Sequence, residues 1–120
     1  MQKSAKLNAH FCCTRALKLL SNGWHQGSSA IRRSGSVTTY EDRNAVSFDI
    51  VGAFRFIRFQ HRIDEQIQRK CQEILLSSIG CSTERMDQWE KAICKWNDAR
   101  GRSKLEVIEM IAAARKASKP

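Results

Sequence analysis

Residues 45–59 read AVSFDIVGAFRFIRF, and the interpretation of this stretch decides the fold class. Every second residue from 46 to 50 is apolar, which favours a strand. No turn residue separates the two halves, however, and Arg55, Arg58 and Arg62 recur at the spacing of one helical face. We therefore predict one helix over residues 45–59. Because it is apolar on nearly every other side, it should lie at the centre of the protein.

Four other stretches repeat apolar residues every three or four positions, as amphipathic helices do. They cover about residues 4–22, 63–79, 83–96 and 103–113. Ser4 is the expected N-cap of the first, and Gly23 the left-handed position that ends it. Ser103 and Glu106 form a capping box that opens the last. The sequence thus predicts an all-α protein.

The predicted helices form a single small bundle, one domain over residues 1–120 with a frayed basic tail at 114–120. One long irregular loop, residues 24–40, separates the first two helices. Its glycines and serines allow a short hairpin that turns at Ser34 and Gly35. Loops of this length in small domains are often functional.

The protein is basic, with 21 Lys and Arg against 12 Asp and Glu and a formal net charge of +9. The excess lies in residues 1–40 and 101–120, because the positive and negative charges balance between them. Clustered basic residues are typical of proteins that bind phosphate backbones. The expected nucleic-acid contacts are Arg32, Arg33, Arg55, Arg58, Arg62, Arg115, Lys116 and Lys119.

Catalytic motifs and closely spaced metal ligands are missing from the sequence. We therefore expect a binding protein rather than an enzyme, with no cofactor and no metal. Asp49 interrupts an apolar segment and should pair with an arginine or cap backbone. Five irregularly spaced cysteines suit a reducing compartment, which favours the cytoplasm. No apolar run reaches the length of a membrane span.

We therefore expect a small regulatory protein that contacts nucleic acid through its basic ends. The alternative is a phage or mobile-element protein that inhibits a host or defence complex by binding it. Its basic charge would suit the nucleic-acid-binding groove of such a complex and argues against mimicry of DNA.

Three short motifs occur in order: GWHQG at residues 23–27, GA at 52–53, and WND at 96–98, just before the capped last helix. In this order the chain resembles an uncharacterised family of small bacterial and phage domains with no established activity. The motif residues are a possible pocket or a structural element: Trp24, Gln26, Gly27, Trp96, Asn97 and Asp98.

The physical properties of the motifs favour a structural role for the two tryptophans. We expect Trp24 and Trp96 to lie near one another and to hold the long loop against the bundle. On that basis Trp96→Ala should cost about 3–5 kcal/mol, and Asn97→Ala only about 1 kcal/mol. For Gln26, Asn97 and Asp98 both a structural and a functional role stay open.

Overall fold

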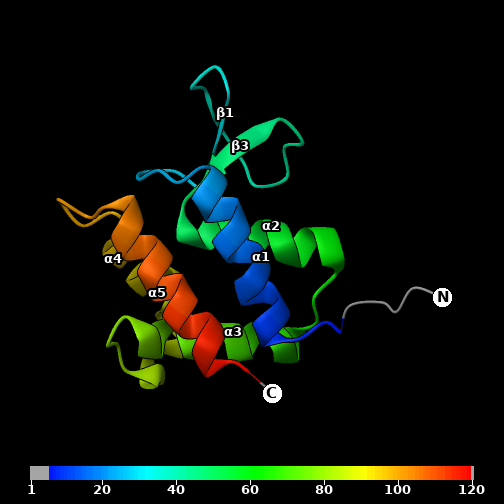
Figure 1. Ribbon diagram of the computed structural model, residues 1–120, viewed down its shortest axis with the longest axis vertical. Coiled ribbons are helices and arrows are strands. Elements are labelled where there is room, and N and C mark those ends of the chain that lie inside the picture. Colours follow the sequence, from blue (N-terminus) through cyan, green and yellow to red (C-terminus); the bar gives the residue numbers. More distant parts are fainter. Residues whose placement is uncertain (1–5, 120) are drawn as a thin grey trace.

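The computed structural model describes residues 6–119, and within them the chain forms five α-helices and one small antiparallel sheet (Figure 1). The helices are α1 (Ala9–Asn22), α2 (Ile50–His61), α3 (Glu65–Ser78), α4 (Trp89–Asn97) and α5 (Lys104–Ala117). The strands are β1 (Ala30–Arg32), β2 (Val37–Thr38) and β3 (Ala45–Phe48), in the order β2-β1-β3. The protein is mainly helical, as predicted, but the all-α prediction missed the sheet.

The prediction of one helix over residues 45–59 is wrong for its first four residues, which form β3. The boundary is Asp49, whose backbone is extended and whose carboxylate accepts a hydrogen bond from Gly52 N at 2.6 Å. An N-cap residue has this extended conformation, so the helix begins at Ile50. The alternation that favoured a strand was therefore the correct signal for residues 45–48, and the helical spacing of the arginines was correct for the rest.

The predicted hairpin at Ser34 and Gly35 is present. Gly35 has a φ of +91° and donates its N–H to Arg32 O at 2.9 Å, which closes the turn between β1 and β2. The third strand completes the sheet through antiparallel pairing with β1, in which Ala30 lies opposite Phe48. Within the predicted loop, residues 30–32 and 37–38 are therefore strands, and the rest remains irregular or forms turns.

The two ends of α1 differ from the prediction. Ser4 lies outside the described residues, and the helix is capped by Asn8, whose side chain accepts from Phe11 N at 2.8 Å. Gly23, with φ −172°, is extended rather than left-handed. A Cβ there would collide with the backbone oxygen of Val46, so glycine is required because β3 passes close to the end of α1.

The core lies around α1, which packs against α2, α3 and α5 (Figure 1). Its largest fully buried side chains include Leu20, Ile57, Leu75 and Ile111, one from each of these helices. Burial of these aliphatic side chains is the main source of stability in a domain of this size. Within residues 6–119, no helix combines the length and apolarity needed to cross a bilayer.

The C-terminal half follows the prediction with two changes. Residues 83–88 form a 3-10 helix, η1 (Thr83–Gln88), and α-helical geometry starts only at Trp89. The capping box is present, with Ser103 Oγ bonded to Glu106 N and Glu106 bonded back to Ser103 N. The final helix then continues to Ala117, so residues 114–117 of the basic tail are helical.

Candidate functional site

Asn97, from the WND motif, is completely buried at the end of α4. Its Oδ1 accepts hydrogen bonds from Trp24 Nε1 at 2.8 Å and from Ile50 N at 3.1 Å. Its Nδ2 donates to His25 O at 3.3 Å and to Asp98 Oδ1 at 2.8 Å. One amide thus uses its full hydrogen-bonding capacity and joins α4, the segment after α1 and the start of α2.

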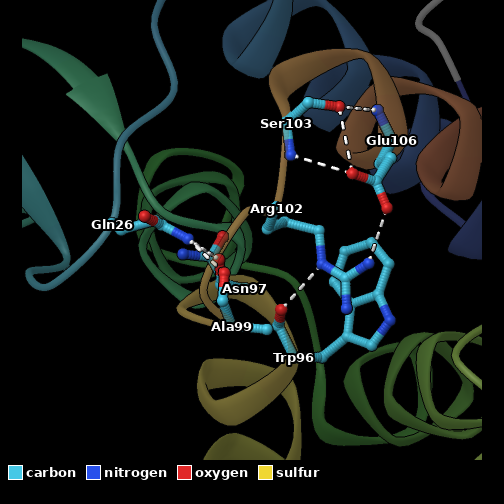
Figure 2. Close-up of polar contacts among 7 residues, drawn as sticks. All are labelled: Gln26, Trp96, Asn97, Ala99, Arg102, Ser103 and Glu106. Carbon is cyan, nitrogen blue, oxygen red and sulfur yellow. Dashed lines mark hydrogen bonds and ion pairs between the residues drawn. The ribbon is translucent and has the colours of Figure 1, made fainter.

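The glutamine and second glycine of the GWHQG motif also contact the end of α4. Gln26 Nε2 donates to Asn97 O at 2.9 Å and to Ala99 O at 3.0 Å, and Figure 2 shows its side chain reaching this turn. Gly27 N donates to Asp98 Oδ1 at 3.0 Å. The structure therefore brings the two motifs together, and their polar groups hold the loop against α4.

Trp96 points to the other side of this junction. Its indole ring lies under the Arg102 guanidinium, whose central carbon is 3.7 Å from the ring centroid (Figure 2). The same guanidinium donates to Trp96 O at 3.0 Å and to Glu106 at 2.8 Å. The two tryptophans therefore do not hold the loop together as a pair. Trp24 bonds to Asn97, the residue after Trp96, and this bond holds the loop against α4. Arg102 is not among the predicted site residues.

His25 is held by hydrogen bonds on both ring nitrogens. Nε2 lies 2.8 Å from Ser28 O, which can only accept, so Nε2 carries the proton and Nδ1 accepts from Ser47 Oγ at 2.8 Å. Burial lowers the pKa of His25. The ring is therefore neutral at pH 7 and serves to order residues 25–28 beside the junction.

A cavity of about 310 Å³ opens beside the junction of the two motifs. We call it the acidic cavity, because Asp49, Glu90 and Asp98 line it, together with Arg55. Burial raises the pKa of Asp49 to about 6, with contributions from the negative charges of Asp98 and Glu90. Burial likewise raises the pKa of the Cys94 thiol at its wall to about 11, so this thiol is protonated and a poor nucleophile at pH 7.

A larger cavity of about 540 Å³ lies along α2. We call it the basic groove, since its walls include Arg55, Arg58 and Arg62 together with Tyr40 and Phe59. The two aromatic rings meet edge to face with centroids 6.5 Å apart, and the Arg55 guanidinium lies 5.7 Å from the Tyr40 centroid. The basic groove is thus an arginine surface with aromatic rings interleaved.

An ion pair separates the two cavities. Arg55 Nε donates to Glu90 at 2.7 Å, and both residues, with Tyr40, line the acidic cavity and the basic groove alike. The pair raises the pKa of Arg55 through its hydrogen bond to Glu90. The two cavities are therefore neighbours with opposite charge.

The other predicted nucleic-acid contacts lie outside the basic groove. Arg32 pairs with Asp42 at 2.5 Å and, with Arg33, belongs to the hairpin at the top of Figure 1. Arg115, Lys116 and Lys119 lie at the C-terminal end of α5, at the bottom of the same view. Arg115 is also engaged by Thr14, to which its Nε donates at 2.9 Å. The structure unites Arg55, Arg58 and Arg62 in one groove, but it leaves the hairpin arginines far from the basic residues at the end of α5.

Sequence reasoning missed the aromatic and acidic partners of these arginines. Tyr40 is the last residue of the predicted loop, and Phe59 was assigned to a buried helix, yet it is 60% exposed. Ala53, Phe54 and Ile57 of α2 do face the core, whereas Phe59 lies on the side of the helix that carries the arginines. The exposure of Phe59 could have been predicted from the sequence, since Phe59 directly follows Arg58. Glu90 gave no signal, because its pairing depends on tertiary structure.

Comparison with known proteins identifies a family. No curated protein and no solved structure matches this chain. A family model described as "Family of unknown function" (DUF6197) matches residues 8–117, a span that includes all three motifs. This confirms the resemblance to a family without established activity that the motifs indicated, and the chain therefore belongs to the family of unknown function DUF6197.

Proposed function

We propose that this protein binds single-stranded nucleic acid in the basic groove. The observation that carries the proposal is the combination of Arg55, Arg58 and Arg62 with Tyr40 and the exposed ring of Phe59 in one groove. Proteins that bind single strands combine a positive groove along the backbone with aromatic rings on which bases stack. The basic groove has both elements.

The charge of the groove supports phosphate binding. Arg58 and Arg62 are exposed, and neither has an ion-pair partner in the part of the chain that the structure describes. Arg55 is already paired with Glu90 and is fixed in place by that contact. The first two arginines would therefore bind phosphates, while Arg55 supports Tyr40.

The exposed aromatic ring favours a single strand over a duplex. Bases in a duplex are stacked on each other, so a protein ring can stack only on a base that is unpaired. Phe59 is a large apolar side chain at 60% exposure on the surface of α2, where burial against a base would be favourable.

The proposal is tested by fluorescence anisotropy with short labelled single-stranded DNA and RNA at two salt concentrations. Arg58→Gln and Arg62→Gln should each reduce the salt dependence by about 0.7 log unit, the value for one contact to a single strand. Phe59→Ala should weaken binding about tenfold through lost stacking. Arg100→Gln and Leu105→Ala are matched controls, since both residues are exposed and outside the basic groove.

Two results would contradict the proposal: no affinity for any single strand at low salt, or unchanged affinity in all three groove variants. Arg33→Gln tests the hairpin separately, since an effect equal to that of Arg58→Gln would extend the interface to the basic ends. A protein partner that survives nuclease treatment and is lost in the Phe59 variant would favour the inhibitor alternative.

A further inference from the structure

A further cavity, of about 590 Å³, lies along α4 and shares no described lining residue with the basic groove or the acidic cavity. We call it the α4 groove. The end of α3 and the residues after it supply Ile79 and Cys81, and α4 with the turn after it supplies Ala92, Trp96 and Ala99. All five are half-buried. The fold therefore leaves an apolar groove on its surface, and surface patches of this kind often bind a partner.

The α4 groove follows one side of its helix. The residues that α4 buries are Trp89, Ile93 and Asn97, which lie four residues apart. Ala92 and Trp96 repeat this spacing one position earlier, so they form a second stripe that lines the groove. None of the described lining residues belongs to a strand, so an extended peptide finds no backbone edge with which to pair. The groove is instead suited to the apolar face of a helix.

The charge of the α4 groove is positive. Lys91 and Lys95 line it and are exposed, and no carboxylate occurs among its described lining residues. Glu90 and Asp98, in α4 and directly after it, line the acidic cavity instead. Because Lys91 and Lys95 are four residues apart in a helix, their Cβ atoms lie about 6 Å from each other. They therefore match two carboxylates with the same spacing on a second helix.

Two other occupants fit the α4 groove less well. A second copy of this chain, docked groove to groove, would bring Lys91 and Lys95 of the two copies together, and these like charges repel. A nucleic acid would attract the lysines, but nucleobases need flat rings on which to stack. Trp96 is the one ring among the described lining residues, and the Arg102 guanidinium covers one of its faces (Figure 2). The chemistry of the groove therefore favours a protein helix that carries carboxylates.

We propose that the α4 groove binds an acidic amphipathic helix of a partner protein. Its apolar side chains pack on Trp96 and Ile79, and its carboxylates pair with Lys91 and Lys95. The nine residues of α4 span about 14 Å, so the bound helix has about three turns in contact. Trp96 is already held by Arg102, so it loses little freedom when the partner binds. The inference does not depend on nucleic-acid binding, because the two grooves are separate.

The experiment uses three synthetic helical peptides of about fourteen residues, which is about four turns. The first has leucines along one stripe and glutamates four positions apart beside it. The second replaces the glutamates by lysines, and the third replaces the leucines by serines. Two-dimensional NMR of the full chain follows the indole N–H of Trp96. The indole of Trp24, which is bonded to Asn97, serves as the internal reference. The first peptide should shift the Trp96 signal and bind about tenfold more tightly than each of the others.

Charge reversal in the groove tests the role of the lysines. The double variant Lys91→Glu with Lys95→Glu should exchange the preference, so that it binds the lysine peptide and not the glutamate peptide. Its matched control is Lys18→Glu with Lys70→Glu, two exposed helical lysines outside the groove, which should keep the wild-type preference. Both double variants should bind single-stranded nucleic acid as the wild type does under the proposed function, since none of the four lysines lines the basic groove.

A third variant tests the apolar part of the groove. Ala92→Gln places a longer, uncharged side chain in the groove and should weaken binding of the first peptide about tenfold, with folding checked by circular dichroism. Equal binding of the glutamate and lysine peptides, or an unchanged Trp96 signal with every peptide at millimolar concentration, would overturn the proposal. A larger Trp96 shift with a single-stranded oligonucleotide than with the first peptide would assign the groove to nucleic acid. A dimer in sedimentation that Ala92→Gln abolishes would assign it to a second copy, and either result would also overturn the proposal.

Discussion

Trp24 Nε1 donates a 2.8 Å hydrogen bond to Oδ1 of Asn97, a residue 73 positions away in the chain. This bond joins the first and last of the three sequence motifs. Since Asn97 is completely buried, no water can replace it as the partner of the indole. The same amide oxygen also caps Ile50 N at the start of α2. One side chain therefore fixes the relative positions of the loop, α2 and α4.

Asn97→Ala should destabilise the protein by about 3 kcal/mol or more. The substitution leaves Trp24 Nε1, Ile50 N and His25 O without partners inside the fold, and each unsatisfied group costs about 1–3 kcal/mol. This loss exceeds the value of about 1 kcal/mol predicted from the sequence. That value treats Asn97 as a turn residue at the surface, whereas Asn97 is completely buried. Urea denaturation followed by circular dichroism measures the loss, and a value under about 1 kcal/mol would contradict the role assigned to Asn97.

Asn97→Asp distinguishes hydrogen bonding from packing, because the two side chains have nearly the same shape. An aspartate cannot donate to His25 O, and its charge would lie beside Asp98 Oδ1. We expect this variant to be at least as unstable as Asn97→Ala at pH 7. Wild-type stability in Asn97→Asp would show that volume alone matters at this position.

Gly52→Ala should strongly destabilise the protein. A Cβ at Gly52 would overlap the backbone oxygen of Ser29, and backbone at the start of β1 cannot move aside as a flexible side chain can. The expected loss is about 3 kcal/mol or more, despite the higher helix propensity of alanine. Ala53→Gly, one position later in α2, is the control and should cost only the usual helix and packing penalty of about 1–2 kcal/mol. Thermal melts of both variants decide the matter.

The GA motif shows how far sequence reasoning extends. A small residue inside an apolar helix indicates close packing, and Gly52 does lie against the backbone of another segment. The partner, however, is Ser29 from the loop before β1 rather than another helix. The spacing of small residues along a helix indicates which face packs closely against another segment. Which segment that is depends on contacts between distant parts of the chain.

The segment at 45–48 shows a different limit. Strand β3 has only four residues, and its pairing partners in β1 lie 13 (Arg32 to Ala45) to 18 (Ala30 to Phe48) residues earlier in the chain. Local apolar alternation was visible, but the absence of a glycine or proline before Ile50 concealed the boundary. Asp49 was itself the boundary signal, since aspartate is among the strongest N-cap residues. The helices, whose signals repeat over several turns, were more accessible to prediction.

Trp96→Ala should cost about 2–3 kcal/mol, less than Asn97→Ala. Trp96 is half-buried, and part of its stabilisation comes from the Arg102 guanidinium over its ring. A double-mutant cycle with Arg102→Ala isolates that contact, whose coupling energy should be about 0.5–2 kcal/mol. Since Arg102 also bonds Glu106, Glu106→Gln serves as a control for the ion pair. A coupling energy near zero would show that the stacking contributes nothing to stability.

Asp49→Asn should change the pH dependence of stability. The folded pKa of Asp49, about 6, lies above the ordinary value of 3.8, so the folded state binds more protons than the unfolded state between these values. The free energy of unfolding of the wild type therefore falls as the pH rises from about 4 to about 6. Asparagine also caps helices but does not ionise, so the variant should gain about 2–3 kcal/mol relative to the wild type across this window.

The difference between wild type and variant is the quantity to measure in that experiment. His25 titrates in the opposite sense, because its lowered pKa makes folding less favourable as the pH falls below about 6.5. This contribution is common to both proteins and cancels in the difference. Chemical denaturation at pH 4, 5, 6 and 7 supplies the curve, and a difference that does not vary with pH would contradict the raised pKa of Asp49.

Arg62→Gly should make the protein more stable and weaken its binding of nucleic acid. Arg62 ends α2 with a φ of 51°, the left-handed conformation, in which a side chain is strained and glycine is not. Removing the side chain should raise the free energy of unfolding by up to about 1 kcal/mol. The same change removes one of the two unpaired arginines of the basic groove, so the affinity for a single strand should fall and the salt dependence should decrease by about 0.7 log unit.

Arg62→Lys keeps the strain and the charge, and it should leave both properties close to wild type. Strain at a non-glycine residue is often retained where the side chain has a functional role. If Arg62→Gly gained stability and bound nucleic acid as tightly as the wild type, the left-handed arginine would have no role in binding, and the basic groove would lose one of its two phosphate contacts.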